Sequence, residues 1–308
     1  DVVLHASVSS EGQHLACINR LFHGEVIYRD VYNISAPLPE FIPYLMMKIS
    51  TIDVSVLRSF YYYGNLLTLL LIYLAAAHLL KRKTAVVFAI LLAVEFAIHN
   101  YWVSRWGGFR LGSAFLVLLL LWAYIDTRRR RWLLLCGAAV AVSLLFSPEM
   151  GVITFFLCGF LVLFLPMLEG AGDNIGSVRW DSLGMFLGGF ALALSPWLIY
   201  CLVTGALYQY LLITFVDIPF RLYKALPYGH EFHPFPYEWW RPENFDLVLK
   251  FWKSKTGWFF LAWIVLGVEF LYLLHTRIRG KWDHAHSKRL TLLIPGAFLL
   301  LLAKRNIH

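Results

Sequence analysis

The chain has 308 residues, of which 59% are hydrophobic, 17% are aromatic and only 15% are charged. A soluble domain carries about 25% charged residues, so this composition excludes an ordinary soluble globular protein and indicates a membrane protein. The net charge of +8 does not indicate a nucleic-acid partner, because the basic residues fall between apolar runs, where they orient helices against anionic lipid.

Apolar runs of roughly helix-spanning length follow one another along the chain. They cover residues 57–80, 84–99, 111–126, 132–147, 151–168, 183–204, 257–276 and 289–303. We therefore expect an all-α fold, a polytopic transmembrane helical bundle that forms one membrane domain over residues 1–308. The chain begins without methionine and ends soon after an apolar run, so we expect it to be truncated at both ends.

Alternation of these spans puts the basic segments 81–83, 128–131 and 277–289 on one face. The density of lysine and arginine in short loops predicts that this face is cytoplasmic. The outer face then receives residues 1–56, the first external loop, and residues 205–256, a second large external loop. We expect an integral protein of a bacterial cytoplasmic membrane, with its site on the outer face.

The first external loop contains a predicted amphipathic helix. Ser10 and Gln13 have the spacing of a capping box, which predicts a helix that begins at Ser10, and Gly24 predicts its end. Its apolar residues share one face, which predicts a helix lying on the membrane; they are Leu15, Ile18, Leu21 and Phe22. Glu11 would lie in the first turn, where the helix dipole stabilises a carboxylate, although it is also simply a good N-terminal helix residue.

Charged residues and then prolines follow this helix. Arg29 and Asp30 lie between aromatic side chains. Pro37, Pro39 and Pro43 argue against a regular span. The segment therefore predicts a loop that returns the chain to the bilayer.

Other outer segments supply further candidates. Arg105 and Arg110 flank a Trp-Gly-Gly turn, where guanidinium groups can hold a phosphate or serve as ordinary lipid anchors. Glu149 follows a proline at a second turn, which is explained equally by a site or by a tight turn. His230 lies in a segment rich in aromatic residues and proline, which could cap an acceptor pocket or form an interfacial aromatic belt.

Three stretches together are similar to one known family. The sequence EGQHLACINRLFHGEVIYRDVYNISAPL resembles the first external loop of GT-C glycosyltransferases, which include protein O-mannosyltransferases and the aminoarabinose transferase of lipid A. RRRRWLLLCGAAVAVSLLFSPEMGV resembles the basic turn, glycine-bearing span and short external turn of that family. PWLIYCLVTGAL resembles a later span that ends in Thr-Gly. Together these stretches cover most of residues 9–210.

The resemblance implies a GT-C-like membrane domain that transfers a sugar from a polyprenyl-phosphate donor to a glycan, lipid or protein acceptor. It implies catalytic roles for Glu11, as base, and for Asp30. The candidate substrate-binding residues are His14, Arg29, Arg105, Arg110, Glu149 and His230. The family usually has Asp-Glu where this chain has Ser10 and Glu11, so Glu11 takes the role, Asp30 takes it, or the chain no longer catalyses transfer.

The rival interpretations are a noncatalytic membrane scaffold or assembly subunit, and a lipid-linked glycan transporter or polymerase. No nucleotide-binding motif is present, since the glycines at 107, 108 and 112 lie in a turn with the wrong spacing. We expect no cofactor. His230 and His233 lack a clear third ligand, which disfavours a divalent metal without excluding it. Partners within a membrane-protein complex are left open.

Overall fold

The computed structural model describes residues 4–33, 36–79, 84, 86, 87, 108–169, 180–222, 267–277, 279, 286 and 290. The chain divides into two compact units. The first comprises residues 1–163 and 178–218, and the second comprises residues 164–177 and 219–308. Most of the described residues belong to the first unit.

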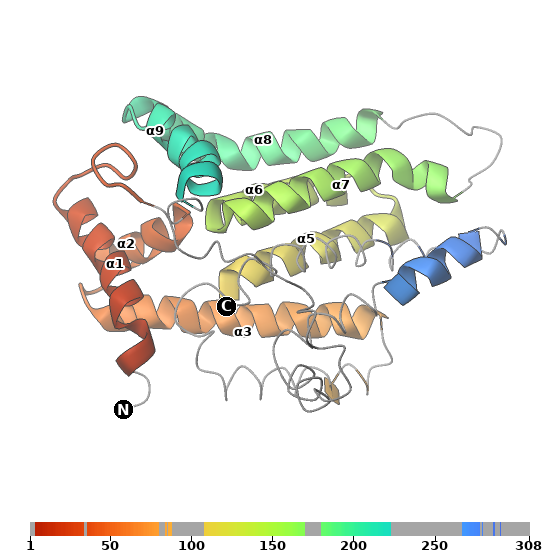
Figure 1. Ribbon diagram of the computed structural model, residues 1–308, viewed down its shortest axis with the longest axis horizontal. Helices are drawn as coiled ribbons and strands as arrows, with labels where there is room; N and C mark the ends of the chain where they lie inside the picture. Colours follow the sequence, from red (N-terminus) through yellow and green to blue (C-terminus); the bar gives the residue numbers. More distant parts are fainter. Residues whose placement is uncertain are drawn as a thin grey trace, which may run out of the picture. The chain divides into compact units, whose positions relative to one another are not determined.

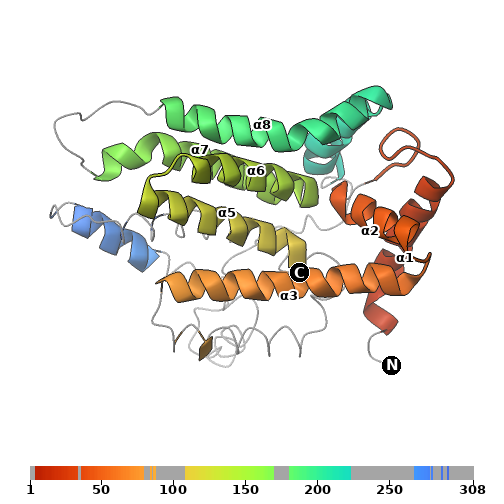
Figure 2. The same ribbon diagram turned by 180° about the vertical axis from the view of Figure 1, so that it is seen from behind.

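Every regular element in the described part of the chain is a helix. Four helices of the first unit, α3 (Val54–Leu79), α5 (Gly108–Thr127), α6 (Arg131–Phe146) and α8 (Trp180–Val203), pack in a row in this order (Figures 1 and 2). Helix α7 (Pro148–Glu169) follows α6. Of the described helices, α3, α5 and α8 are long and apolar enough to cross a membrane, whereas α6 and residues 148–163 of α7 form shorter apolar helices.

These helices coincide with five of the expected apolar runs. Their ends agree with the sequence to within a few residues, because long apolar runs bounded by polar or glycine residues specify helices strongly. The runs at 84–99 and 289–303 lie almost entirely outside the described residues, and of the run at 257–276 only residues 267–276 are described, as helix.

A polar contact explains where α3 begins, and a glycine explains where α8 ends. Asp53 caps α3, since its Oδ1 accepts a hydrogen bond of 2.9 Å from the Ser55 backbone N–H, and this bond lowers the pKa of the Asp53 carboxyl. Gly205, at φ +72°, ends α8 in the left-handed conformation that favours glycine. A cap and a glycine therefore fix two helix ends that lie beside the segment before α3.

Reciprocal glycines allow α6 and α8 to approach closely. A methyl group at Gly137 of α6 would overlap the backbone carbonyl of Phe186, and one at Gly189 of α8 would overlap the carbonyl of Leu134. Small residues at such contacts are typical of helices that pack within a membrane, where close van der Waals contact replaces the hydrophobic effect. This contact holds the middle of the row together.

The first loop departs from the prediction at its start. Helix α1 spans Leu4–Phe22, so Ser10 lies inside the helix and the predicted start at Ser10 is wrong. A capping-box pattern marks a possible start, but serine costs less than about 0.7 kcal/mol inside a helix, so the helical turn before it can still form. Glu11 consequently lies beyond the first turn, where the helix dipole has little effect. The predicted end is confirmed, since Gly24 follows the helix at φ +82°.

The apolar stripe of α1 faces protein rather than lipid. Ile18 packs with Met47 and Leu57, and Leu21 belongs to a buried cluster that includes Trp197 and other residues of α8. The expectation that this face lies on the membrane is therefore wrong. An amphipathic pattern shows that one face is covered, but it does not distinguish a lipid surface from a neighbouring helix.

The proline-rich segment forms a second helix, α2 (Leu38–Ile49). Pro37 is its N-cap residue, and proline is compatible with a first helical turn because no N–H is needed there. Twelve residues are too few to cross a bilayer, which agrees with the expected absence of a regular span. Its faces are unusual, because Glu40 is buried while Ile49 is 86% exposed.

The second large loop begins as helix. Helix α9 spans Leu207–Leu212, and the π-helix η2 follows over Ile213–Leu222. Tyr210 of α9 is buried against Tyr28 of the first loop, with ring centroids 5.1 Å apart. The two external loops predicted from the sequence therefore contact each other. Residues 223–256, including the predicted aromatic segment, lie outside the described residues.

Candidate functional site

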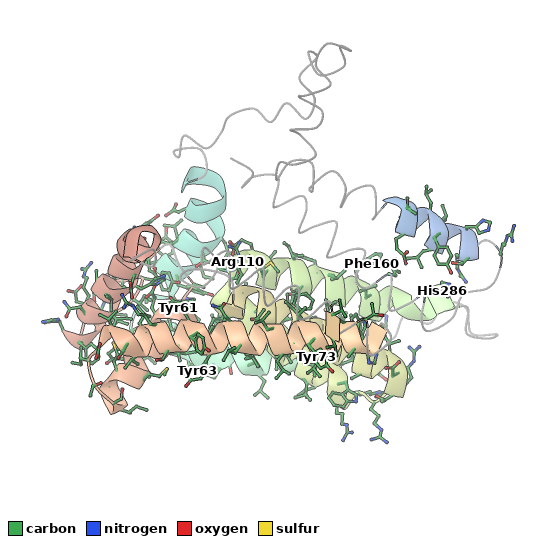
Figure 3. The ribbon with its side chains drawn as sticks, turned by 90° about the horizontal axis from the view of Figure 1, so that it is seen from below. Tyr61, Tyr63, Tyr73, Arg110, Phe160 and His286 are labelled. Carbon is green, nitrogen blue, oxygen red and sulfur yellow. The ribbon has the colours of Figure 1, made fainter. Side chains whose placement is uncertain are left out.

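Six of the eight predicted site residues gather where α1, α2 and the ends of several helices meet. We call this region the loop end; it comprises residues 11–33, 36–58, 108–113, 143–150 and 197–213. It contains Glu11, His14, Arg29, Asp30, Arg110 and Glu149. Arg110 and Tyr61 lie toward this end of the helices, whereas Tyr73 and Phe160 lie farther along them (Figure 3). Arg105 and His230 lie outside the described residues.

Glu11 pairs with Arg58, a residue of the first turns of α3. The Arg58 Nε donates to Glu11 Oε1 at 2.7 Å, and Nη2 donates to Oε2 at 3.2 Å, so the guanidinium grips both carboxylate oxygens. The Glu11 side chain is 14% exposed and the Arg58 side chain is 63% exposed. The pair thus places an acid and a cation from two helices at a position that solvent reaches.

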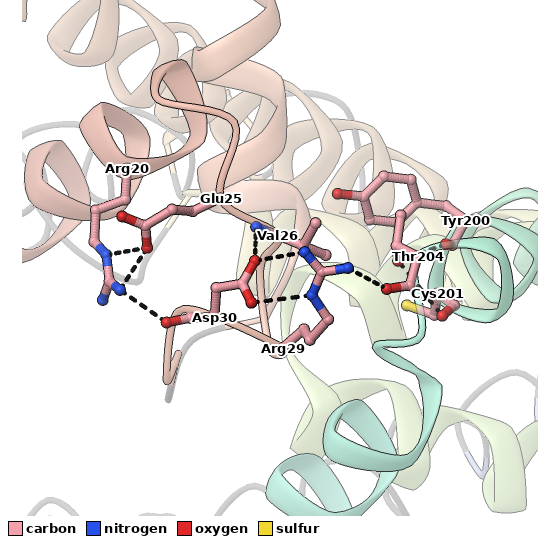
Figure 4. A network of polar contacts seen from close by, with 8 residues as sticks. All are labelled: Arg20, Glu25, Val26, Arg29, Asp30, Tyr200, Cys201 and Thr204. Carbon is pink, nitrogen blue, oxygen red and sulfur yellow. Dashed lines mark hydrogen bonds and ion pairs between the residues drawn. The ribbon is translucent and has the colours of Figure 1, made fainter.

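Asp30 organises the turn that follows α1 (Figure 4). Its carboxylate accepts hydrogen bonds from Arg29 Nε at 3.0 Å, from Arg29 Nη2 at 2.8 Å and from the Val26 backbone N–H at 2.8 Å. These contacts, with Arg29 first, lower the pKa of Asp30 to about 2. A carboxylate with so low a pKa is a weak base, and both oxygens of Asp30 already accept hydrogen bonds. Asp30 therefore suits a structural role better than proton abstraction.

Arg29 also joins the first loop to the end of α8. Its Nη1 donates to the backbone carbonyl of Thr204 at 2.9 Å, directly before the glycine that ends the helix. Arg20 contributes from the other side, since its Nη2 donates to the Asp30 backbone carbonyl at 2.8 Å and its Nε donates to Glu25 at 2.6 Å. The network fixes the loop on α8.

Tyr28 anchors the same turn in the apolar core. It is a non-glycine residue at φ +70°, an uncommon conformation that surrounding contacts must maintain. Its ring is 3% exposed and packs edge-on against Trp197 and Tyr210. Burial raises the pKa of Tyr28 well above its usual range. The strained turn therefore holds Arg29 and Asp30 outward while Tyr28 points inward.

His14 makes a buried contact with Glu40 of α2. The distance between His14 Nδ1 and Glu40 Oε1 is 2.6 Å, and the two side chains are 7% and 2% exposed. Burial raises the pKa of Glu40, although His14 opposes the shift. The second oxygen of Glu40 and the hydroxyl of Tyr61 are both buried without a hydrogen-bond partner among the described residues. His14 is thus enclosed in protein rather than placed at an accessible surface.

Arg110 and Glu149 form a third pair. Arg110 Nη2 donates to Glu149 Oε1 at 2.7 Å, and the Ser147 hydroxyl donates to Glu149 Oε2 at 2.7 Å. Arg110 comes from the first turn of α5, while Glu149 comes from the first turn of α7. Both side chains are a little more than a quarter exposed. The pair therefore joins two helix starts and stays open to solvent.

Sequence reasoning missed Arg58 and Glu40. Arg58 was read as part of an apolar span, although a cation in the first turns of such a span is a signal for a boundary position. Glu40 stands among prolines, and that composition predicted a loop instead of a helix with a buried face. Arg58 lies 47 residues from Glu11 in the sequence, and Glu40 lies 26 residues from His14. No periodic pattern of the sequence predicts contacts at such separations.

Among the described residues, no group of three or more His, Cys, Asp or Glu side chains is placed to hold a metal ion. Comparison with protein-family profiles, with curated proteins and with solved structures finds no match to this chain.

Proposed function

We propose that the protein is a polytopic membrane glycosyltransferase that transfers a sugar from a polyprenyl-phosphate donor to an acceptor on the outer face of the membrane. The ion pair between Glu11 and Arg58 is the observation that supports this proposal most directly. A carboxylate can accept the proton of an acceptor hydroxyl, and a guanidinium matches the geometry of a phosphate. The pair holds both groups in contact and leaves Arg58 mostly exposed.

The reaction requires one proton transfer and one displacement. The acceptor hydroxyl would give its proton to the Glu11 carboxylate, and its oxygen would form a bond to the anomeric carbon. The bond from that carbon to the phosphate oxygen breaks, and the polyprenyl phosphate leaves with the electron pair. Arg58 would turn from Glu11 to the phosphate as the donor binds, which stabilises the departing charge and frees Glu11 to act as the base.

The other predicted residues support this centre in different ways. Arg110, partly exposed and paired with Glu149, supplies a second guanidinium for the phosphate. Arg29 and Asp30 hold the loop against α8 through the contacts to Val26 and Thr204, which is a positioning role. His14 is buried and would not touch the substrate.

Replacement of Glu11 by Gln tests the proposal. The amide keeps the size of the side chain and removes the base, so we expect transfer of a labelled sugar from a polyprenyl-phosphate donor to fall roughly a hundredfold or more. Asp181→Asn is the control, because Asp181 is an exposed acid in the first turn of α8 that pairs with Arg130 and lies outside the loop end; it should leave transfer unchanged. Full turnover by the Glu11 variant would refute its role as the base.

A noncatalytic membrane subunit is the second candidate. It is favoured by one specific observation, namely that Glu11, Asp30, Glu40 and Glu149 each already contact a guanidinium or an imidazole. A loop end in which these charges neutralise one another would serve as a docking scaffold. Binding of a polyprenyl-phosphate sugar that is lost in Arg58→Ala would favour the enzyme, whereas no binding by the unaltered protein would favour the scaffold.

A further inference from the structure

The buried contact between His14 and Glu40 lies one helical turn from the proposed base. Residues three or four apart share a helix face, so Glu11, His14 and Ile18 line one side of α1. Glu11 contacts Arg58, the His14 ring lies 5.7 Å from the Tyr61 ring, and Ile18 packs with Leu57. One side of α1 therefore packs across the first two turns of α3.

A carboxyl group at the position of Glu40 is energetically unfavourable, because it is removed from water. Its side chain is 2% exposed, and only one of its carboxylate oxygens has a hydrogen-bond partner among the described residues. Replacement of a buried charged or polar pair by apolar groups of similar size is often neutral or stabilising. Stability alone therefore does not explain a carboxyl group here, although a directional contact between α1 and α2 does.

The remaining contacts of α1 in this region fix its direction poorly. Ile18 and Leu21 are held by apolar packing, which is non-directional and allows small rotations of a helix about its axis. The pair of Glu11 with Arg58 is bidentate, but Arg58 is 63% exposed, so solvent and salt screen it more than they screen a buried contact. A short hydrogen bond in a dry environment is directional, so the contact from His14 to Glu40 is the best fixed point for the rotation of α1.

We propose that Glu40 is a positioning residue that acts through His14 to hold α1 in the rotation that presents Glu11 to Arg58. The proposal rests on the proposed function for its consequence in the reaction, but its geometric part does not. Loss of the contact lets α1 rotate, and Glu11 then leaves the position from which it would take the acceptor proton. Glu40 itself touches neither substrate nor phosphate.

Cys17 provides a geometric readout that needs no activity. It follows His14 by three residues on α1, and its side chain is 6% exposed. Burial raises the pKa of its thiol to about 12, so alkylation at neutral pH is slow. Rotation of α1 would expose this thiol. The rate of alkylation of the Cys17 peptide, measured by mass spectrometry on the full chain in nanodiscs, therefore reports the orientation of α1.

Two substitutions separate positioning from bulk stability. Glu40→Leu keeps most of the volume and removes the hydrogen bond, whereas Glu40→Gln keeps a hydrogen-bonding amide. Glu40→Leu leaves His14 buried without its partner, so some loss of stability is expected. At temperatures well below its melting transition we still expect Glu40→Leu to accelerate Cys17 alkylation severalfold, and we expect Glu40→Gln to keep alkylation slow. Asp181→Asn, the exposed control, should match the unaltered protein. Equal Cys17 alkylation in all four proteins would overturn the proposal, as would alkylation of Glu40→Leu that accelerates only as the protein approaches its melting temperature.

Sugar transfer supplies the second arm. A misplaced base lowers turnover more than binding, so Glu40→Leu should reduce kcat by up to about a hundredfold with little change in the KM for the donor, and Glu40→Gln should recover most of it. If the unaltered protein transfers no sugar, the proposed function fails, while the alkylation experiment still decides whether Glu40 orients α1. If Glu40→Leu changes alkylation but leaves kcat intact, the positioning role in the reaction is refuted.

Discussion

The two ends of the helix row carry similar ion pairs in different surroundings. At the loop end, Arg58 holds a Glu11 side chain that is 14% exposed, and His14 meets Glu40 in a buried contact. At the opposite end, which we call the arginine end and define as residues 78, 126–131 and 181, Arg130 pairs with Asp181 at 3.2 Å, with side chains 61% and 73% exposed. Exposed pairs of this kind contribute little to stability.

Pairs at both ends join helices, since Arg130 links the start of α6 to Asp181 of α8. The difference lies in how far the pairs are shielded from solvent and linked to further contacts. Loop-end contacts join α1 to α3, α1 to α2, α5 to α7 and the first loop to α8, and each contact excludes solvent from at least one partner or belongs to a wider network. Arginine-end charges stand in a short basic turn at residues 128–131, where they suit the orientation of a helix in a membrane. The charged residues of the loop end therefore hold neighbouring segments in a defined arrangement, whereas those of the arginine end mark where the apolar helices stop.

The largest expected effect comes from a substitution that disturbs the packing between the two ends. Gly189→Ala places a methyl group on the Leu134 carbonyl, so we expect a loss of about 1 to 3 kcal/mol of stability, measured as the melting temperature in detergent. Gly188→Ala is the matched control, since nothing lies within 4 Å of a methyl group there, and the substitution should be neutral or gain up to about 1 kcal/mol. Equal stability of both variants would show that α6 and α8 do not pack closely.

The next effect separates the two ends directly. Arg29→Ala removes hydrogen bonds to Asp30 and to the Thr204 carbonyl, so the first loop should detach from α8 and be cleaved severalfold faster in limited proteolysis. Arg130→Ala removes only an exposed pair at the arginine end, and its cleavage pattern should be unchanged. Similar protection of the first loop in both variants would contradict the distinction between the ends.

Asp30 should make the stability of the loop end depend on pH in the acid range. Its pKa is lowered to about 2 from 3.8, so its contribution to folding is present above about pH 4 and is lost as the pH falls toward 2. The fluorescence of Trp197, which packs against Tyr28, should report loosening of the loop in this range. Asp30→Asn should remove that transition, whereas Asp181→Asn at the arginine end should leave it in place.

The smallest expected effect is the pH dependence of stability that Glu40 contributes, and its sign is opposite to that of Asp30. Burial raises its pKa, so protonated Glu40 stabilises the folded state, and this contribution is lost as the pH rises from the ordinary carboxyl range near 4.5 through the raised value. We expect the melting temperature to fall over that range in the unaltered protein and to fall less in Glu40→Gln. An identical pH dependence in both proteins would show that Glu40 is ionised and solvated in the folded state.

The sequence predicted the long helices better than the loop end. The runs that became α5, α6 and α8 are apolar over most of their length, and local composition is enough to specify a helix there. Gly24 likewise predicted the end of α1, because few residues other than glycine adopt its conformation readily. Local signals therefore located the long helices and the end of α1, but not α2, which the sequence predicted as a loop.

What the sequence could not provide was the partner of each charged residue. Glu11 was expected to depend on a helix dipole, but α1 begins seven residues before it and Arg58 is its partner. The sequence predicts that His14 binds substrate, yet the proline-containing helix α2 buries it against Glu40. Such contacts depend on how helices distant in the sequence pack, which no local pattern encodes.

The sharpest test exchanges the charges of the central pair. A chain with both Glu11→Arg and Arg58→Glu restores an ion pair between α1 and α3 but moves the acid to the other helix. We expect the melting temperature of this double variant to lie near that of the unaltered protein, while sugar transfer from a polyprenyl-phosphate donor stays abolished. Recovery of both stability and transfer would contradict the assignment of Glu11 as the base, because any ion pair would then suffice.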